Sequence, residues 1–152
     1  MGILKKLFNF INRCFATGLF SGYIPGAPGT YGSLLAAILV FYLPGLTSAT
    51  LIIGLFFLGV LSSQLEEKRT GLKDEGKIVI DEIIGVFITF IGFSLSPVII
   101  IIGFILFRLF DIFKPFLIDR VQNLPGGWGV MVDDLVAGIA SNLVLRLILY
   151  II

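Results

Sequence analysis

Long apolar stretches separated by short polar ones dominate this chain. No charged residue occurs between Arg13 and Glu66, from Ile83 to Phe107, or from Leu135 to Leu145. Charge-free stretches of this length are typical of helices whose solvent is lipid rather than the core of a water-soluble protein. The pattern therefore predicts several helical membrane segments.

Proline and glycine divide the apolar stretches into pairs of helices. Residues 33–65 are interrupted by Pro44 and Gly45, and residues 83–110 are interrupted by Pro97. Because proline ends or kinks a helix, each range predicts a helical hairpin rather than one long helix.

The two ends of the chain each predict one further helix. Residues 1–20 carry Lys5 and Lys6 before an apolar stretch that polar residues interrupt, which indicates an interfacial amphipathic helix rather than a signal peptide. Asp133 precedes the apolar range 134–152 and is expected to cap a last membrane helix. We predict an all-α, small polytopic membrane bundle of about five segments, with residues 1–152 forming a single domain.

Five crossings place the polar ranges 66–82 and 111–133 on the same face as the N-terminal helix. All ten acids and ten of the eleven cations then lie on that face, which the positive-inside rule makes cytoplasmic. A rival topology fuses 83–110 into one kinked helix and places Asp111 across the membrane from Asp81, against both burial cost and charge bias. The first and third segments would reach only roughly 18 Å, so the sequence leaves open whether they cross the whole bilayer.

Composition narrows the chemistry. The chain is 57% hydrophobic and 14% charged, which excludes an ordinary water-soluble globule, and its net charge of +1 gives no basic surface for nucleic acid. It contains no histidine, which excludes phosphohistidine mechanisms, and its one cysteine, Cys14, is interpreted as a small apolar filler. Any catalysis must use carboxylates, cations and hydroxyls.

The range 111–133 is predicted to be a cytoplasmic catalytic loop.

A glycine- and proline-rich turn at 25–33 opens directly into a predicted helix. Its candidate phosphate-binding residues are Gly29, Thr30, Gly32 and Ser33. Such a turn offers backbone N–H groups and hydroxyls to an anion, but it lacks the lysine and spacing of a P-loop, so an ordinary capped turn is the alternative. Gly126 and Gly127 begin a second candidate anion site.

Paired carboxylates are candidate metal ligands. Asp81 is followed by Glu82 and Asp133 by Asp134, each pair at a predicted helix start, while Asp74 precedes the first pair. Clustered carboxylates that leave space for water and phosphate suit Mg²⁺. Acids at helix N-termini are also favoured by the helix dipole, so plain helix packing is the alternative.

Two stripes of small residues at helical spacing link these acids. One stripe follows Asp81 and contains Gly85, and the other follows Asp134 and contains Gly138. Packing the stripes together would bring both carboxylates to one point beneath the Thr30 turn.

Arg108, Asp111 and Lys114 are spaced by three, so all three can lie on one face of a helix end. Cations on either side of an acid suit a phosphate clamp beside a base or metal ligand, whereas a surface string of ion pairs is the alternative. Glu66 and Glu67 are interpreted as solvated loop charges, and Arg146 as a side chain that reaches the far interface.

At these positions the chain resembles the phosphatidylglycerophosphatase A family of bacterial membrane phosphatases, over nearly its whole length. Four ordered motifs carry the resemblance: Gly29-Thr30-Tyr31-Gly32-Ser33-Leu34; Asp74 with Asp81-Glu82 and Gly85; Phe107-Arg108 with Asp111 and Lys114-Pro115; and Gly126-Gly127 with Asp133-Asp134. The chain departs from the pattern at Glu75 and Leu117, where the family usually has proline.

The resemblance implies a magnesium-dependent enzyme that removes the terminal phosphate of phosphatidylglycerophosphate, in the bacterial cytoplasmic membrane. Its partners would be that lipid and other membrane lipids. Two alternatives remain: a headgroup phosphotransferase, whose usual aspartate-glycine-alanine-arginine string is missing here, and a non-enzymatic transporter or scaffold. The sequence determines neither oligomeric state, metal count, acyl-chain preference nor the identity of the nucleophile.

Overall fold

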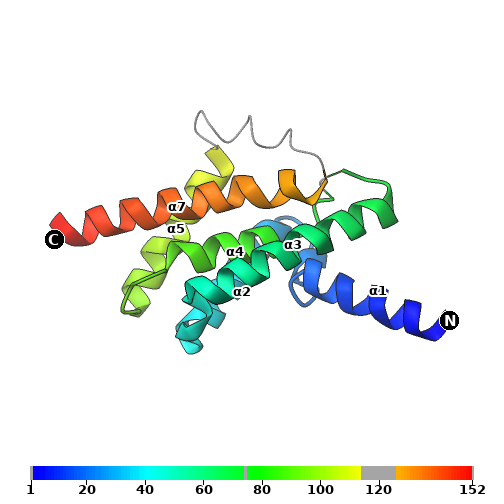
Figure 1. Ribbon diagram of the computed structural model, residues 1–152. Coiled ribbons are helices and arrows are strands. Elements are labelled where there is room, and N and C mark those ends of the chain that lie inside the picture. Colours follow the sequence, from blue (N-terminus) through cyan, green and yellow to red (C-terminus); the bar gives the residue numbers. More distant parts are fainter. Residues whose placement is uncertain (1, 74, 114–125, 152) are drawn as a thin grey trace.

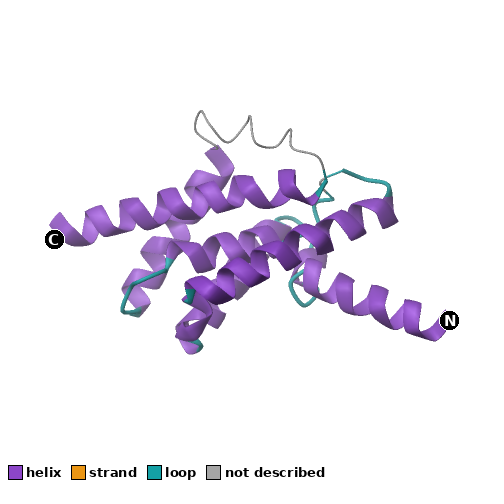
Figure 2. Cartoon of the chain, viewed as in Figure 1, coloured by secondary structure: helices purple, strands orange, loops and turns teal. Residues whose placement is uncertain are grey.

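A computed structural model describes residues 2–73, 75–113 and 126–151, which form six α-helices, two short 3-10 helices and no strand (Figures 1 and 2). The all-α prediction is confirmed. The elements are α1 (Gly2–Ala16), η1 (Ser21–Tyr23), α2 (Pro28–Tyr42), η2 (Pro44–Thr47), α3 (Ala49–Thr70), α4 (Ile80–Thr89), α5 (Pro97–Phe113) and α7 (Gly127–Ile151).

The first predicted hairpin is present as α2 and α3. Pro44 follows the end of α2 and begins η2, which turns the chain into α3. α3 continues through Glu66 to Thr70 and ends at Gly71, whose φ of 75° is a left-handed conformation that glycine adopts without strain.

The second hairpin is also present, and the rival topology with one kinked helix over 83–110 is wrong. Phe90 lies directly against Gly103, where a Cβ atom would collide with the phenyl ring, so α4 and α5 pack closely. Glu82 at the start of α4 and Arg108 near the end of α5 both approach Gly29. The chain therefore reverses between them.

α4 is the buried centre of the bundle and packs against α2, α3, α5 and α7. It approaches α7 where the two stripes of small residues meet, because a Cβ atom on Gly138 would collide with the carbonyl oxygen of Gly85. The predicted pairing of these stripes is confirmed. The core around this contact includes Ile84, Val86, Phe107 and Ala137.

The last helix begins at Gly127, so the prediction that Asp133 caps it is wrong. Gly127 and Gly129 lie in the first turn of α7, and Gly126 precedes it. Gly127 lies so close to the carbonyl oxygen of Val60 that any side chain would collide with α3. The glycines here permit close packing of helices. Consequently Asp133 and Asp134 lie in the second turn of α7. The predicted loop 111–133 is wrong at both ends, where 111–113 belong to α5 and 127–133 to α7, and residues 114–125 lie outside the described part of the chain.

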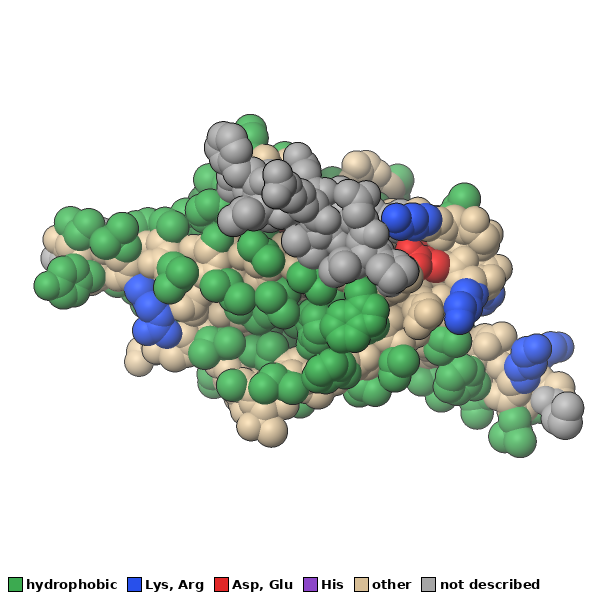
Figure 3. Space-filling view, turned by 45° about the horizontal axis from the view of Figure 1, so that its top comes forward, with side chains coloured by type: hydrophobic (Ala, Val, Ile, Leu, Met, Phe, Trp, Pro, Cys, Tyr) green, Lys and Arg blue, Asp and Glu red, His purple; other side chains and the backbone are tan. Residues whose placement is uncertain are grey.

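Two of the described helices, α3 and α7, are long and apolar enough by length and composition to cross a membrane, fewer than the five predicted segments. α2 is apolar but shorter. Hydrophobic side chains cover the middle of the face shown in Figure 3, whereas basic groups gather toward the end that carries the N-terminus. α1 exposes Ile3, Leu4, Leu7 and Phe8, as expected for an interfacial helix.

Candidate active site

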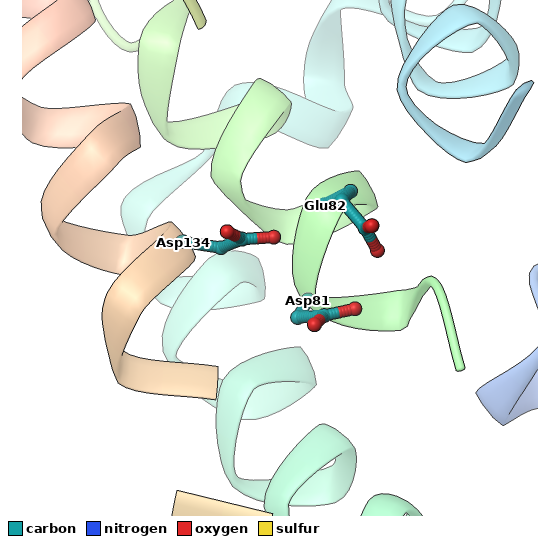
Figure 4. Close-up of side chains that lie close together, drawn as sticks. All are labelled: Asp81, Glu82 and Asp134. Atoms are coloured by element: carbon teal, nitrogen blue, oxygen red, sulfur yellow. The ribbon is translucent and has the colours of Figure 1, made fainter. Parts of the chain in front are cut away.

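The candidate site lies where α4 begins, α5 ends and the second turn of α7 passes. Asp134 points from α7 toward the first turn of α4, which carries Asp81 and Glu82 (Figure 4). Each of the three offers a carboxylate oxygen, and these oxygens lie within 4.8 Å of one another. The predicted convergence of Asp81 and Asp134 is confirmed.

The three acids are removed from water. Asp81 is 9% exposed and Asp134 is 3% exposed, while Glu82 is half-buried. Oδ1 of Asp81 and Oε2 of Glu82 are buried and have no hydrogen-bond partner among the residues that the structure describes. Buried carboxylate oxygens without a partner are costly, which indicates that a group other than the described residues satisfies them.

The electrostatics of the cluster agree with this geometry. Burial raises the pKa of the Asp81 carboxyl well above its ordinary value, and the charges of Glu82 and Asp134 raise it further. Burial also raises the pKa of the Glu82 carboxyl. The charge of Asp111 raises this pKa further, whereas the charge of Arg108 lowers it. Burial and mutual repulsion therefore make it costly for Asp81 and Glu82 to be ionised together.

This donor set fits a magnesium ion. Mg²⁺ prefers oxygen ligands, usually one or two carboxylates with the remaining positions left to water and phosphate. Asp81, Glu82 and Asp134 offer carboxylates only, and two of them have an oxygen that no described donor reaches. Soft thiolate or imidazole ligands are not present in this group.

Arg108 connects the acidic cluster to the turn before α2. Its Nη1 donates to Asp111 Oδ2 and to Ser33 Oγ, the latter at 3.2 Å. Nε of Arg108 is buried and has no hydrogen-bond partner in the described part of the chain. The guanidinium therefore has a donor that the described residues do not use.

The turn at 25–33 contributes less backbone than expected. Pro28 has no N–H, and the amides of Thr30 and Tyr31 both donate to the carbonyl oxygen of Ala27. Gly29 is needed because a Cβ atom there would collide with the Glu82 carboxylate, and Gly32 because it packs on Val79. The turn thus packs directly against the Glu82 carboxylate and the Arg108 guanidinium.

The remaining predicted residues have mixed outcomes. Asp133 is 6% exposed and accepts a hydrogen bond from the backbone N–H of Asp134. Gly126 and Gly127 pack on α3, beside Gln64 and Val60, and their role toward phosphate stays a prediction. Asp74 and Lys114 lie outside the described residues.

One of two interpretations of charged residues was wrong. Glu66 is 2% exposed rather than solvated, because Asn12 of α1 and Arg69 both donate to its carboxylate. Arg146 is exposed, donates to the carbonyl oxygen of Ile91 and lies over the Phe93 ring, and its interpretation as a side chain that reaches the far interface stays a prediction.

Asn142 is a structural residue that sequence reasoning missed. Its side-chain amide is within hydrogen-bond distance of the carbonyl oxygens of Ile88, Thr89 and Ile91. It therefore caps the C-terminal end of α4 from the neighbouring helix. A polar residue in an apolar helix, four residues before Arg146, was the available signal.

Comparisons with known proteins show the family of this chain. The family model for phosphatidylglycerophosphatase A matches residues 14–149. A protein named phosphatidylglycerophosphatase A from Haemophilus influenzae is 40% identical, over 97% of this chain and 94% of its own length. A protein of the same name from Escherichia coli is also 40% identical, over 83% of this chain and 76% of its own length.

A protein from Bacteroides thetaiotaomicron named putative phosphatidylinositol-3-phosphatase is 38% identical, over 88% of this chain and 90% of its own. No solved structure matches the chain. The family match covers well over half of the sequence and includes every described candidate residue of the acidic cluster and the Arg108 clamp. The chain therefore belongs to the phosphatidylglycerophosphatase A family and is a phosphatase.

Proposed function

We propose that the protein hydrolyses the terminal phosphomonoester of phosphatidylglycerophosphate, with Mg²⁺ as cofactor, giving phosphatidylglycerol and phosphate. The observation that carries this proposal is the meeting of three carboxylates from α4 and α7 beside Arg108, which also approaches Gly29. The acids would hold a metal cation. This cation and the Arg108 guanidinium would together bind a phosphate group that carries more than one negative charge.

In this mechanism Asp81, Glu82 and Asp134 are the metal ligands, with Asp133 and Asp74 as further candidates. A bound Mg²⁺ supplies charge that polarises phosphoryl oxygens and lowers the pKa of water. Arg108 and Lys114 bind the phosphate and stabilise the negative charge that develops on it.

The other candidate residues orient these groups. Asp111 accepts from Arg108 and so fixes the direction of its guanidinium. Ser33 accepts from Arg108 and donates to the Gly29 carbonyl oxygen at 2.7 Å, which ties the clamp to α2. The Thr30 hydroxyl, Gly29, Gly32, Gly126 and Gly127 are the proposed phosphate-side residues of the surrounding turns.

The protein is proposed to be multi-pass in the bacterial cytoplasmic membrane, with this site facing the cytoplasm. The two long apolar helices α3 and α7 support membrane association, and the bias of ten of eleven cations to one face supports the orientation. We keep the proposal that five helical segments lie in the membrane. Because α4 has ten residues and rises only about 15 Å, it would depend on neighbouring helices rather than on lipid contact.

A second substrate deserves a direct comparison, because the Bacteroides relative is named for a phosphoinositide. The purified protein would be assayed for phosphate release from phosphatidylglycerophosphate and from phosphatidylinositol 3-phosphate in the same mixed micelles. We expect the first lipid to be hydrolysed faster and Lys114→Met to lower its turnover by about a hundredfold. Preferential hydrolysis of the inositol lipid would replace the proposed substrate, and near-normal turnover of Lys114→Met would remove Lys114 from the site.

A further inference from the structure

An open apolar groove of about 350 Å³ runs between α2 and α5. Its walls are exclusively apolar or aromatic apart from the Tyr42 hydroxyl, and it includes Leu34, Ala37, Phe41, Pro97, Ile101 and Phe104. The volume equals about a dozen groups the size of a water molecule, each of about 30 Å³. The groove thus has the dimensions of a short length of hydrocarbon chain rather than of a folded partner.

One end of this groove meets the candidate site. Ala37 lies one helical turn from Ser33 on α2, and Phe104 lies one turn from Arg108 on α5. Since Arg108 donates to Ser33, the two helices are joined at the point where the groove begins. From there to Tyr42 the groove follows α2 for about 12 Å, away from the charged groups.

A second apolar groove offers a comparison within the same molecule. It has a similar volume of about 360 Å³ and lies between α1 and α3. Near it, Asn12 donates to Glu66, and Arg69 already pairs with that carboxylate. Each of these two grooves has a neighbouring arginine whose buried Nε has no partner among the described residues, Arg108 for the first and Arg13 for the second. Of the two arginines, Arg108 is the one that lies beside Glu82 and pairs with Asp111 at the candidate site.

We propose that the groove between α2 and α5 binds one acyl chain of the lipid substrate while its phosphate lies at Arg108. The proposal rests on the proposed function and adds the position of the hydrophobic part of the substrate. It makes Ala37 and Ile101 determinants of how well the lipid is held. An acyl chain in the groove would limit the positions that the phosphate can take relative to Asp81 and Asp134.

Photolabelling tests the position directly and needs no turnover. Phosphatidylglycerophosphate with a diazirine midway along one acyl chain would be bound to the protein in detergent, and the labelled peptides identified by mass spectrometry. We expect labelling within residues 34–42 and 97–104, with competition by the unlabelled lipid. Labelling spread evenly over α3 and α7, or concentrated between α1 and α3, would overturn the proposal.

Filling the groove provides the functional test. Ala37→Phe places a ring on its floor, Ile101→Trp enlarges its exposed wall, and Ile53→Trp on the outward face of α3 is the matched control. We expect both groove variants to lose the photolabel and to lower kcat/KM for the lipid about tenfold, as displacing about two buried methylene groups would. Melting in detergent identifies any variant that fails to fold, and Ile101→Trp then carries the test.

The two proposals fail in different ways. If the wild type releases phosphate but groove-filling variants keep both the photolabel and kcat/KM, the acyl site is wrong and the proposed function stands. If the groove is labelled but no phosphate is released from the lipid, the proposed function is wrong while the groove is still a lipid site.

Discussion

The two ends of α4 are built in opposite ways. At its start, Asp81 and Glu82 lie against Asp134 and leave two buried oxygens without a partner in the described structure. At its end, Asn142 donates to the carbonyl oxygen of Thr89, and Arg146 donates to that of Ile91, two residues beyond the helix. Unpartnered buried carboxylates cost free energy, whereas capped carbonyls stabilise a helix. The start of α4 therefore offers carboxylate ligands to a cation, whereas the contacts at its end stabilise the fold.

The largest effect is expected from removing an acid at the start of α4. Asp134→Asn keeps the shape of the side chain but loses the charge that a metal requires, so we expect phosphate release to fall about a thousandfold. The midpoint of thermal unfolding without metal should stay equal or rise, because repulsion among buried acids is relieved. Glu67→Gln is the control. A variant that loses stability and activity together would instead make Asp134 a structural residue.

Two ion pairs with the same spacing sharpen the comparison. Arg108 pairs with Asp111 beside the acidic cluster, and Arg69 pairs with Glu66 where α1 meets α3. We expect Arg108→Gln to lower kcat about a hundredfold, because the guanidinium would stabilise transition-state charge, with partial recovery in Arg108→Lys. Arg69→Gln should lower the melting temperature while kcat stays near the wild type. Equal losses of kcat in both variants would show that neither pair is specific to catalysis.

The capped end of α4 should respond in stability rather than in chemistry. Asn142→Ala leaves helix carbonyls without their donors, and we expect it to lower the free energy of unfolding by about 1–3 kcal/mol. Below its melting temperature the variant should keep kcat within about twofold, since distant sites act independently. Leu143→Ala, at an exposed position of the same helix, is the control. A hundredfold loss of kcat in folded Asn142→Ala would contradict the division between the two ends.

A smaller effect is expected from pH. Burial raises the pKa values of Asp81 and Glu82, so their contribution to stability is present below the ordinary carboxyl pKa of about 4 and is lost as pH rises through the folded values. The melting temperature of the metal-free protein should therefore fall over this range, with a smaller fall in Asp81→Asn. Identical pH profiles of melting temperature for the wild type and Asp81→Asn would show that ionisation of Asp81 does not destabilise the fold.

The sequence predicted the hairpins and the meeting of the acids because both depend on local signals. Pro44 and Pro97 mark turns, and the stripes through Gly85 and Gly138 identify the contact that brings Asp81 to Asp134. Long-range polar contacts carry no such signal. The burial of Glu66 depends on Asn12, which is 54 residues away, and the start of α7 depends on the approach of Gly127 to Val60.

The central claim is that the acids at the start of α4 hold a magnesium ion, and calorimetric titration of purified, metal-free protein in detergent with Mg²⁺ measures this directly. The account predicts saturable binding in the wild type and in Glu67→Gln, and at least about tenfold weaker binding in Asp81→Asn and Asp134→Asn. Equal affinity in all four proteins, or no binding by the wild type, would contradict it.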